Sequence, residues 1–318
     1  MNWTAADVPD QSGRTIVITG ANSGIGLEAT RELARNGATV IMACRSVDRG
    51  EAAARDVRED VPDADLRVEA CDLASLDSIR AFADRLGDEP IDGLVNNAGV
   101  MAIPRSETDD GFEMQFGVNH LGHFALTGLV LENLLGDDGD RESRIVTVSS
   151  RMHERGEIDF DDLHGERSYD GWNAYAQSKL ANVLFAYELE RRLRAADVNA
   201  LSVAVHPGYA STNLQFRGPE QRGQRVRKAI MTVMNAVLAQ STEQGALPTL
   251  YAASAPDVEG GAYYGPGGVL NMRGAPERQL SSDRSHDRES ARRLWRVSRD
   301  LTGVEYDLPK PTIDEATV

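Results

Sequence analysis

The stretch TIVITGANSGIG, residues 15–26, decides the fold of this chain. Its first five residues are all β-branched and predict a short buried strand. Gly20, Gly24 and Gly26 follow, and an amphipathic pattern to about Asn36 predicts a helix that begins at this turn. Glycines at such a junction let the backbone approach a pyrophosphate at the helix N-terminus. The simpler alternative is a tight turn that needs only positive φ, because the spacing T-G-x-x-x-G-x-G differs from the G-x-G-x-x-G of dinucleotide sites.

Strand and helix patterns alternate along the rest of the chain. We expect helices to about residue 36 and over 48–59, 76–86, about 112–135 and 172–194, and strands over 15–19, 39–43, 66–70, 93–95, 144–148 and 200–205. This order predicts an α/β fold: a single doubly wound Rossmann-type domain with a central parallel sheet flanked by helices on both faces. The domain is expected over 12–303, with a longer excursion at about 210–240 and loose termini at 1–11 and 304–318.

The charge of the chain is strongly negative. Fifty Asp and Glu residues against 34 Lys and Arg residues give a net charge of −16, which disfavours nucleic acid and anionic membranes as partners. Only Lys179, Lys228 and Lys310 are lysines. Such a surface suits a halophilic protein that works in concentrated salt, where screening weakens self-repulsion. The alternative is an ordinary acidic protein with a bias toward arginine.

The remaining composition predicts a cytoplasmic protein. Cys44 and Cys71 are the only cysteines, and their number and spacing indicate neither a disulfide framework nor a zinc or other metal site. No stretch approaches the roughly 20 apolar residues of a transmembrane segment. The polar first residues lack the pattern of a signal peptide.

A tyrosine and a lysine four residues apart, Tyr175 and Lys179, form the candidate catalytic pair. Residues at this spacing share one helix face, so the ammonium is expected to lower the pKa of the phenol and make it a general acid. Ser150, at the end of an apolar run, would orient the same substrate oxygen. Taken alone, the pattern is more often a core aromatic beside a solvated lysine.

Several motifs in register show a resemblance to a known family. After TGANSGIG come NNAG at 96–99, Asn119, Ser150, Tyr175-x-x-x-Lys179 and HPG at 206–208. The chain is similar to the short-chain dehydrogenases/reductases over about 12–303. The segments GVNHLGHF (117–124), RIVTVSS (144–150) and YAQSKLANVLF (175–185), and a later ARRLWRVS, resemble the retinol-dehydrogenase-like branch.

The resemblance implies a role for each catalytic position. Tyr175 would exchange a proton with the substrate oxygen, and Lys179 would lower its pKa and bind the nicotinamide ribose. Ser150 would hold the substrate oxygen, with Ser149 as the fallback if the strand ends one residue earlier. Asn119 would help to relay protons through water. Hydride would pass directly between the nicotinamide and the substrate carbon.

The second strand indicates which nicotinamide nucleotide is bound. It ends in Ala43-Cys44-Arg45 without a carboxylate, and an arginine there accommodates the 2′-phosphate of NADP. NAD is the less favoured alternative, since Asp48 could reach a ribose, and Arg49 could assist Arg45. From the motif and the resemblance, we expect the cofactor to contact Gly20, Asn22, Ser23, Gly24, Ile25, Gly26, Arg45, Asp72, Leu73, Asn97, Ala98, Gly99, Tyr175, Lys179, Pro207, Gly208 and Thr212.

Other conspicuous residues receive plainer interpretations. His120 and His123 share a helix face, but no third metal ligand is evident, so packing or capping explains them better. His206 is interpreted as structural. Tyr263 and Tyr264 either border the active site or form a turn. The apolar segment 229–239 could be a substrate lid, a membrane-touching patch or core, and a lid is favoured.

The predicted function is NADP-dependent interconversion of a carbonyl and an alcohol on an apolar small molecule. Reduction of a C=C bond, as in protochlorophyllide reductases, is one alternative, and a non-catalytic NADP-binding redox sensor is another. Substrate identity would depend on residues 151–170 and 210–240. Helices 112–135 and 173–194 form a dimer bundle in many relatives, so a homodimer or homotetramer is expected unless the C-terminal extension alters that surface.

Overall fold

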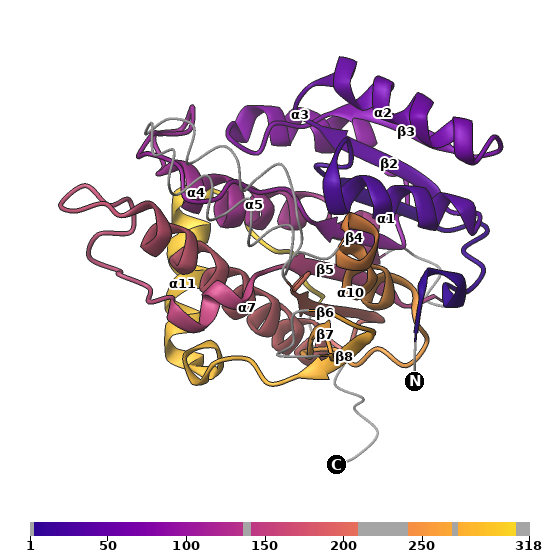
Figure 1. Cartoon of the computed structure of the whole chain (residues 1–318). Coiled ribbons are helices and arrows are strands. Elements are labelled where there is room, and N and C mark those ends of the chain that lie inside the picture. Colours follow the sequence, from indigo (N-terminus) through magenta and orange to yellow (C-terminus); the bar gives the residue numbers. More distant parts are fainter. Residues whose placement is uncertain (1–2, 136–140, 209–240, 269–272, 310–318) are drawn as a thin grey trace, which may run out of the picture.

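The β-branched runs of the sequence form one eight-stranded sheet in the order β3-β2-β1-β4-β5-β6-β7-β8, seen in the computed structural model of the chain (Figure 1). The structure describes residues 3–135, 141–208, 241–268 and 273–309. Neighbouring strands are parallel except for β8, which runs antiparallel to β7. The strands are β1 (Thr15–Thr19), β2 (Thr39–Cys44), β3 (Leu66–Ala70), β4 (Gly93–Asn96), β5 (Ser143–Val148), β6 (Ala200–Val205), β7 (Tyr263–Pro266) and β8 (Pro276–Gln279).

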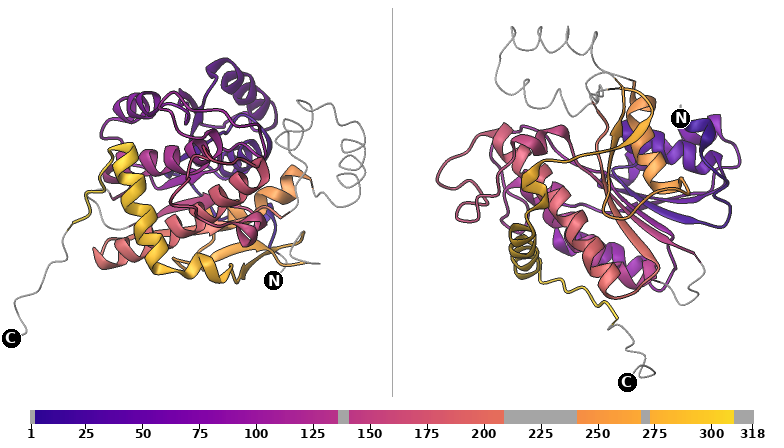
Figure 2. Two further views of the ribbon diagram at one scale, coloured as in Figure 1. Left: turned by 90° about the vertical axis from the view of Figure 1, so that its left-hand side faces the viewer. Right: turned by 90° about the horizontal axis from the view of Figure 1, so that it is seen from below.

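Helices cover both faces of this sheet, as expected for a doubly wound fold (Figures 1 and 2). One face packs against α1 (Gly24–Arg35), α2 (Val47–Asp60) and α10 (Thr242–Ser254). The other packs against α3 (Leu76–Leu86), α5 (Gly122–Leu129), α6 (Leu131–Leu135), α7 (Gly171–Ala195) and α11 (Arg288–Thr302). The fold class predicted from the sequence is confirmed.

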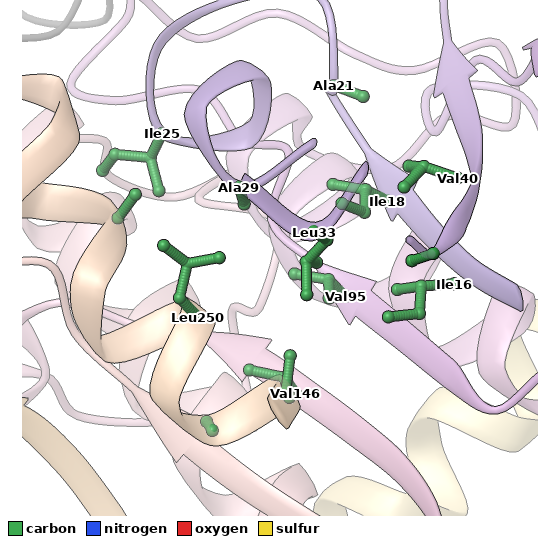
Figure 3. Packing of buried hydrophobic residues seen from close by; sticks show 14 of the residues in the cluster. Ile16, Ile18, Ala21, Ile25, Ala29, Leu33, Val40, Val95, Val146 and Leu250 are labelled. Carbon is green, nitrogen blue, oxygen red and sulfur yellow. The ribbon is translucent and has the colours of Figure 1, made fainter. Parts of the chain in front are cut away.

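The two faces take alternate residues of each strand, because successive side chains of a strand point to opposite sides. In β1, Ile16 and Ile18 belong to the first core and Val17 to the second. Figure 3 shows the first core, where Leu33 of α1 and Leu250 of α10 lie over the strands. The central strands are therefore buried on both sides, which explains their continuous apolar runs.

The predicted single helix over 112–135 is wrong. This region divides into α4 (Met114–Phe116), a π-helical turn η2 (Gly117–Leu121), α5 and α6. The two glycines that bound the wide turn allow a close approach to its neighbours. A Cβ at Gly117 would lie 2.5 Å from the Thr108 side chain, and one at Gly122 would lie 2.6 Å from the Leu73 carbonyl oxygen. Local packing thus overrides a pattern that reads as one continuous helix.

Three further expectations about the ends and loops need correction. Tyr263 and Tyr264 form neither a turn nor part of the cleft, because they begin strand β7. The segment before residue 12 is not loose, since Trp3 packs edge-on against Tyr251. Residue 304 also does not begin a loose tail. The Tyr306 ring packs at a tilt against Trp295, and its hydroxyl donates a hydrogen bond to the Phe124 carbonyl oxygen.

Among the described helices, none combines the length and apolar character needed to cross a bilayer. The described residues also contain no cluster of three metal-ligating side chains. His120 instead bonds Ser298 of α11, with 2.8 Å between Nε2 and Oγ.

Candidate active site

A cleft of ≈ 740 Å³ opens at the carboxyl ends of the parallel strands. It lies where the strand order reverses between β1 and β4, the usual ligand-binding place in such sheets. Nearly all predicted site residues line it: Gly20, Asn22, Ser23, Gly24, Ile25, Gly26, Arg45, Asp72, Leu73, Asn97, Ala98, Gly99, Ser150, Tyr175, Lys179, Pro207 and Gly208. Thr212 and the segment 229–239 fall outside the described residues.

The glycine turn forms the floor of the nucleotide end of the cleft. Gly20 and Gly24 have φ values of 66° and 57°, a region that favours glycine. A Cβ at Gly26 would lie 2.6 Å from the Gly20 carbonyl oxygen, so α1 can begin this close to β1 only with glycine there. The side chain of Ser23 makes no capping hydrogen bond to α1. The first N–H groups of the helix can therefore bind an anion.

Arg45 stands between this cleft and a second hollow of ≈ 510 Å³. The hollow is also lined by Ser46 and Arg49, and by Asp56 at its far side. Asp56 pairs with Arg31 at 2.7 Å, which leaves the two arginines of the hollow as local positive charge in an acidic protein. Asp48 lines neither hollow. The hollow thus presents two arginine side chains that could hold an anionic group.

Tyr175, Lys179 and Ser150 meet at the other end of the cleft. The carboxylate of Asp170 caps α7, accepting from Trp172 N and Asn173 N at 2.9 and 3.0 Å, and Tyr175 and Lys179 follow on the inner face of this helix. Both side chains are buried, and the ammonium lies 5.7 Å from the centroid of the phenol ring. The Ser149 hydroxyl donates to the Lys179 carbonyl oxygen, so Ser150, and not the fallback Ser149, is free to face the phenol.

The pKa of Tyr175 moves opposite to the prediction. Burial raises the pKa of the phenol to about 12, and only a hydrogen bond with Ser150 opposes this rise. Burial also lowers the pKa of Lys179 to about 8. The ammonium donates to the Val148 carbonyl oxygen at 3.0 Å rather than to the phenol oxygen. Loss of water therefore outweighs the effect of the neighbouring cation in this structure.

Asn119 lies behind the wall of the cleft and does not line it. Its side chain is fully buried in the π-helical turn, where Oδ1 accepts from Val100 N at 2.8 Å. Nδ2 donates to the Val100 carbonyl oxygen and to Ser178 Oγ, both at 2.9 Å. The amide thus joins the loop after β4 to the residue next to Lys179.

His206 holds the turn that contains Pro207 and Gly208, in agreement with its structural interpretation. Its Nδ1 accepts from Gly208 N at 3.2 Å. The other ring nitrogen then donates to Gln279 Oε1 at 2.9 Å. Burial lowers the pKa of this imidazole to about 4, so it stays neutral in these roles.

Sequence reasoning missed most of the apolar wall of the cleft. The missed residues come from separate segments, and no spacing links them: Met101, Met114, Val118 and Trp172. Met152, within the expected 151–170 region, joins them. Only Trp172 carried a signal, since it lies three residues before Tyr175 and its ring packs edge-on against the phenol.

Comparisons with known proteins agree with this geometry. The family model for the short chain dehydrogenases matches residues 14–222. Human retinol dehydrogenase 13 is 44% identical over 298 residues, which cover 92% of this chain and 86% of that protein. Mouse retinol dehydrogenase 12 is 42% identical, over 93% of this chain and 88% of that protein.

Solved structures show the same fold. An uncharacterised protein from Mycobacterium Paratuberculosis is 44% identical, with a TM-score of 0.80 over 97% of this chain and all of that one. A protein from Beutenbergia cavernae, described as a candidate NAD(P)-dependent gluconate 5-dehydrogenase and holding NADP at low occupancy, is 27% identical. Its TM-score is 0.58, over 76% of this chain and 90% of that chain.

Proposed function

This chain belongs to the short-chain dehydrogenases/reductases, in the retinol-dehydrogenase-like branch, and we propose that it interconverts a carbonyl and an alcohol with NADP as the hydride carrier. The observation that carries this proposal is the single cleft that contains the glycine turn, Arg45 and the Ser150–Tyr175–Lys179 group. An apolar substrate fits the methionine and tryptophan wall, because flexible methionine side chains adapt to varied apolar shapes.

The described residues fit a dinucleotide. The turn at Gly20, Gly24 and Gly26 would hold the pyrophosphate, and Arg45 with Arg49 would hold the 2′-phosphate. Asp72 and Leu73 would flank the adenine, and Asn97 to Gly99 the adjoining ribose. When bound, the nicotinamide supplies or accepts the hydride. The protein then contributes position and electrostatics.

The phenol of Tyr175 would donate its proton to the substrate oxygen during reduction. A pKa of about 12 keeps that proton in place at neutral pH, yet an alkoxide forming on the substrate is a stronger base still. Ser150 would donate a hydrogen bond to the same oxygen. Lys179 would stabilise the tyrosinate left after the transfer, because an ammonium at this distance attracts the new negative charge. Asn119 lies behind the wall of the cleft, so its part in returning a proton would be to hold Val100 and Ser178 in place.

Oxidation of NADPH and NADH by the purified protein, with a panel of apolar aldehydes and ketones at several salt concentrations, tests the activity. Turnover to the alcohol with NADPH supports it. Binding of NADPH without turnover of any carbonyl would instead favour a redox sensor. With an α,β-unsaturated aldehyde, mass spectrometry and NMR of the product distinguish the allylic alcohol from the saturated aldehyde that a C=C reductase would form.

Cofactor preference is tested at Arg45. Charge-assisted hydrogen bonds are worth about 1.5–3 kcal/mol, so Arg45→Ser should raise KM for NADPH roughly 10- to 100-fold and leave KM for NADH nearly unchanged. Arg55→Ser is the matched control, since Arg55 is exposed on α2 and lines neither hollow. Equal behaviour of the two variants would contradict a 2′-phosphate site at Arg45.

A further inference from the structure

His123 lies in the first turn of α5, just after the π-helical turn, and its side chain is buried. It contacts polar groups of two other segments of the site. Its Nδ1 is 3.1 Å from the Asn119 carbonyl oxygen. Its Nε2 is 2.9 Å from Thr19 Oγ1, at the end of β1 and directly before Gly20.

The donor and the acceptor of each hydrogen bond around His123 and Thr19 follow from the chemistry of the groups. The Asn119 carbonyl can only accept, so Nδ1 carries the ring proton and donates it. Burial lowers the pKa of His123 to about 4, so the ring is neutral and Nε2 has a free lone pair. Thr19 Oγ1 already accepts from Asn97 N at 2.9 Å and Ala98 N at 3.0 Å. Its own proton therefore goes to Nε2 at 2.9 Å, in preference to the Val95 carbonyl oxygen at 3.3 Å.

The result is one chain of hydrogen bonds among buried groups. It runs from the N–H groups of Asn97 and Ala98 through the Thr19 hydroxyl and the imidazole to the Asn119 carbonyl. Asn97 and Ala98 line the cleft, and Asn97 Nδ2 also donates to the Thr19 carbonyl oxygen at 2.8 Å. The imidazole thus joins the turns beside the nucleotide to the backbone of Asn119.

The Asn119 carbonyl that the imidazole contacts lies in the π-helical turn Gly117–Leu121. In this turn the Gly122 N–H bonds the Gly117 carbonyl oxygen, five residues back, so the backbone is wider than in an α-helix. The Asn119 carbonyl takes its bond from the His123 ring, while its amide reaches Val100 and Ser178. The ring therefore contacts the backbone of Asn119, whose side chain bonds Ser178, the residue before Lys179.

We infer that His123 is a positioning residue with two separable arms: a Thr19 arm that sets the nucleotide-binding turns, and an Asn119 arm that sets the proton-transfer side of the cleft. Both arms rest on the proposed function: the first on its NADP site and the second on its reaction. The first arm concerns NADP binding and can be measured without turnover.

Two substitutions separate the arms. His123→Asn keeps an N–H donor close to the position of Nδ1 but cannot reach Thr19. His123→Gln places an amide oxygen near the position of Nε2, where it can accept from Thr19, and loses the bond to Asn119. Leaving a buried polar group unpaired costs about 1–3 kcal/mol, so each arm should be worth roughly a 5- to 100-fold effect.

The expected result is a split between binding and rate. His123→Asn should raise the Kd for NADPH, measured by nucleotide fluorescence, at least about fivefold with a smaller change in kcat. His123→Gln should lower kcat at least about fivefold and leave the Kd within about twofold. Thr19→Val should raise the Kd for NADPH as His123→Asn does, and the double variant should bind no more weakly than either single variant. Thr19→Ser keeps the hydroxyl and should bind NADPH as the wild-type protein does.

His120→Gln is the matched control. His120 is equally buried in the same turn, but it bonds Ser298 of α11 and no segment of the cleft. We expect it to lower the melting temperature without changing Kd or kcat. If the His123 variants only lower the melting temperature, as His120→Gln does, His123 is a core residue and the inference is wrong. If the wild-type protein turns over no carbonyl, the proposed reaction is wrong. The Kd values for NADPH still show whether the bond between His123 and Thr19 supports nucleotide binding.

Discussion

Tyr175 loses most of its contact with water in α7, and this burial defines its chemistry. The phenol keeps its proton over the whole physiological range, so it is a donor that acts only on a strong base. Tyr175→Phe removes the donor and little volume. General acids contribute about 10²–10⁴-fold, and we expect a loss of kcat in that range with nearly unchanged NADPH binding.

Tyr187→Phe provides the control for this experiment. Tyr187 lies in the same helix and is also buried, but its hydroxyl bonds Ser281, away from the cleft. Its removal should leave kcat unchanged. Full activity of the Tyr175 variant would refute the assigned acid.

Lys179 gives activity and stability opposite pH dependences. Burial lowers the pKa of Lys179 from 10.5 to about 8 in the folded protein. Below pH 8 the buried side chain is charged, and this lowers the stability of the fold. Between pH 8 and 10.5 the unfolded chain holds the proton that the folded chain has released, so this group makes stability rise with pH. The charge that would stabilise tyrosinate is lost over the same range.

The rate of reduction should therefore fall as pH rises through about 8. The pH profile of kcat/KM reports the free enzyme and is the measurement to make. In Lys179→Arg the side chain stays charged over this whole pH range. The activity that remains in this variant should therefore not show the fall in kcat/KM at alkaline pH. If the fall in kcat/KM persists unchanged in that variant, it arises from the titration of another group and not from Lys179.

At the scale of elements, the junction of β1 and α1 is the tightest part of the site. A Cβ at Gly26 would lie 2.5 Å from Asn97 Nδ2 and 2.6 Å from the Gly20 carbonyl oxygen. Gly26→Ala should push α1 away from the strand and raise the Kd for NADPH at least about tenfold. Gly93→Ala is the control, because its nearest neighbour would be at an ordinary 3.4 Å and its Kd should not change.

The same elements show how much the sequence can predict. The glycine turn, the Tyr175–Lys179 spacing and the alternation of strands are local patterns, and the structure brings these residues to one cleft. The π-helical turn within 112–135 lies where Gly117 and Gly122 approach Thr108 and Leu73, and Leu73 is far away in sequence.

Other features depend on tertiary contacts in the same way. The methionine wall is assembled from distant segments, and the pKa of Tyr175 depends on burial that no spacing reveals. His123 looked like packing in the sequence because Thr19, its partner, lies 104 residues away.

For the whole molecule, the net charge of −16 predicts a dependence on salt. Raising KCl from about 0.1 M to about 1 M shortens the screening length from about 10 Å to about 3 Å, which weakens repulsion among exposed carboxylates. Exposed ion pairs such as Arg299–Asp300 oppose this effect only slightly, because they contribute little stability. We expect the melting temperature to rise with KCl in thermal scans, and indifference to salt would remove the halophilic interpretation.

The burial of α7 also constrains assembly. Every residue from Tyr175 to Glu190 is buried within one copy of the chain, and α11 packs against this helix and α5 (Figure 2). Over Tyr175–Glu190, α7 therefore offers little exposed surface for the dimer bundle expected from relatives. We predict that any oligomer leaves α5 and α7 out of its interface. Light scattering gives the mass, and hydrogen exchange at α7 that slows on self-association would contradict this prediction.

The packing of α11 and Tyr306 also has a consequence for biosynthesis. Phe124 and Phe185 lie between the sheet and Trp295, so their outer sides stay uncovered until residues 288–308 have left the ribosome. The nucleotide-binding half can form its strand pairs while translation continues, whereas the half that contains Tyr175 must wait. A nascent chain stalled before residue 288 would carry an open aromatic surface, the kind of feature that chaperones and proteases recognise.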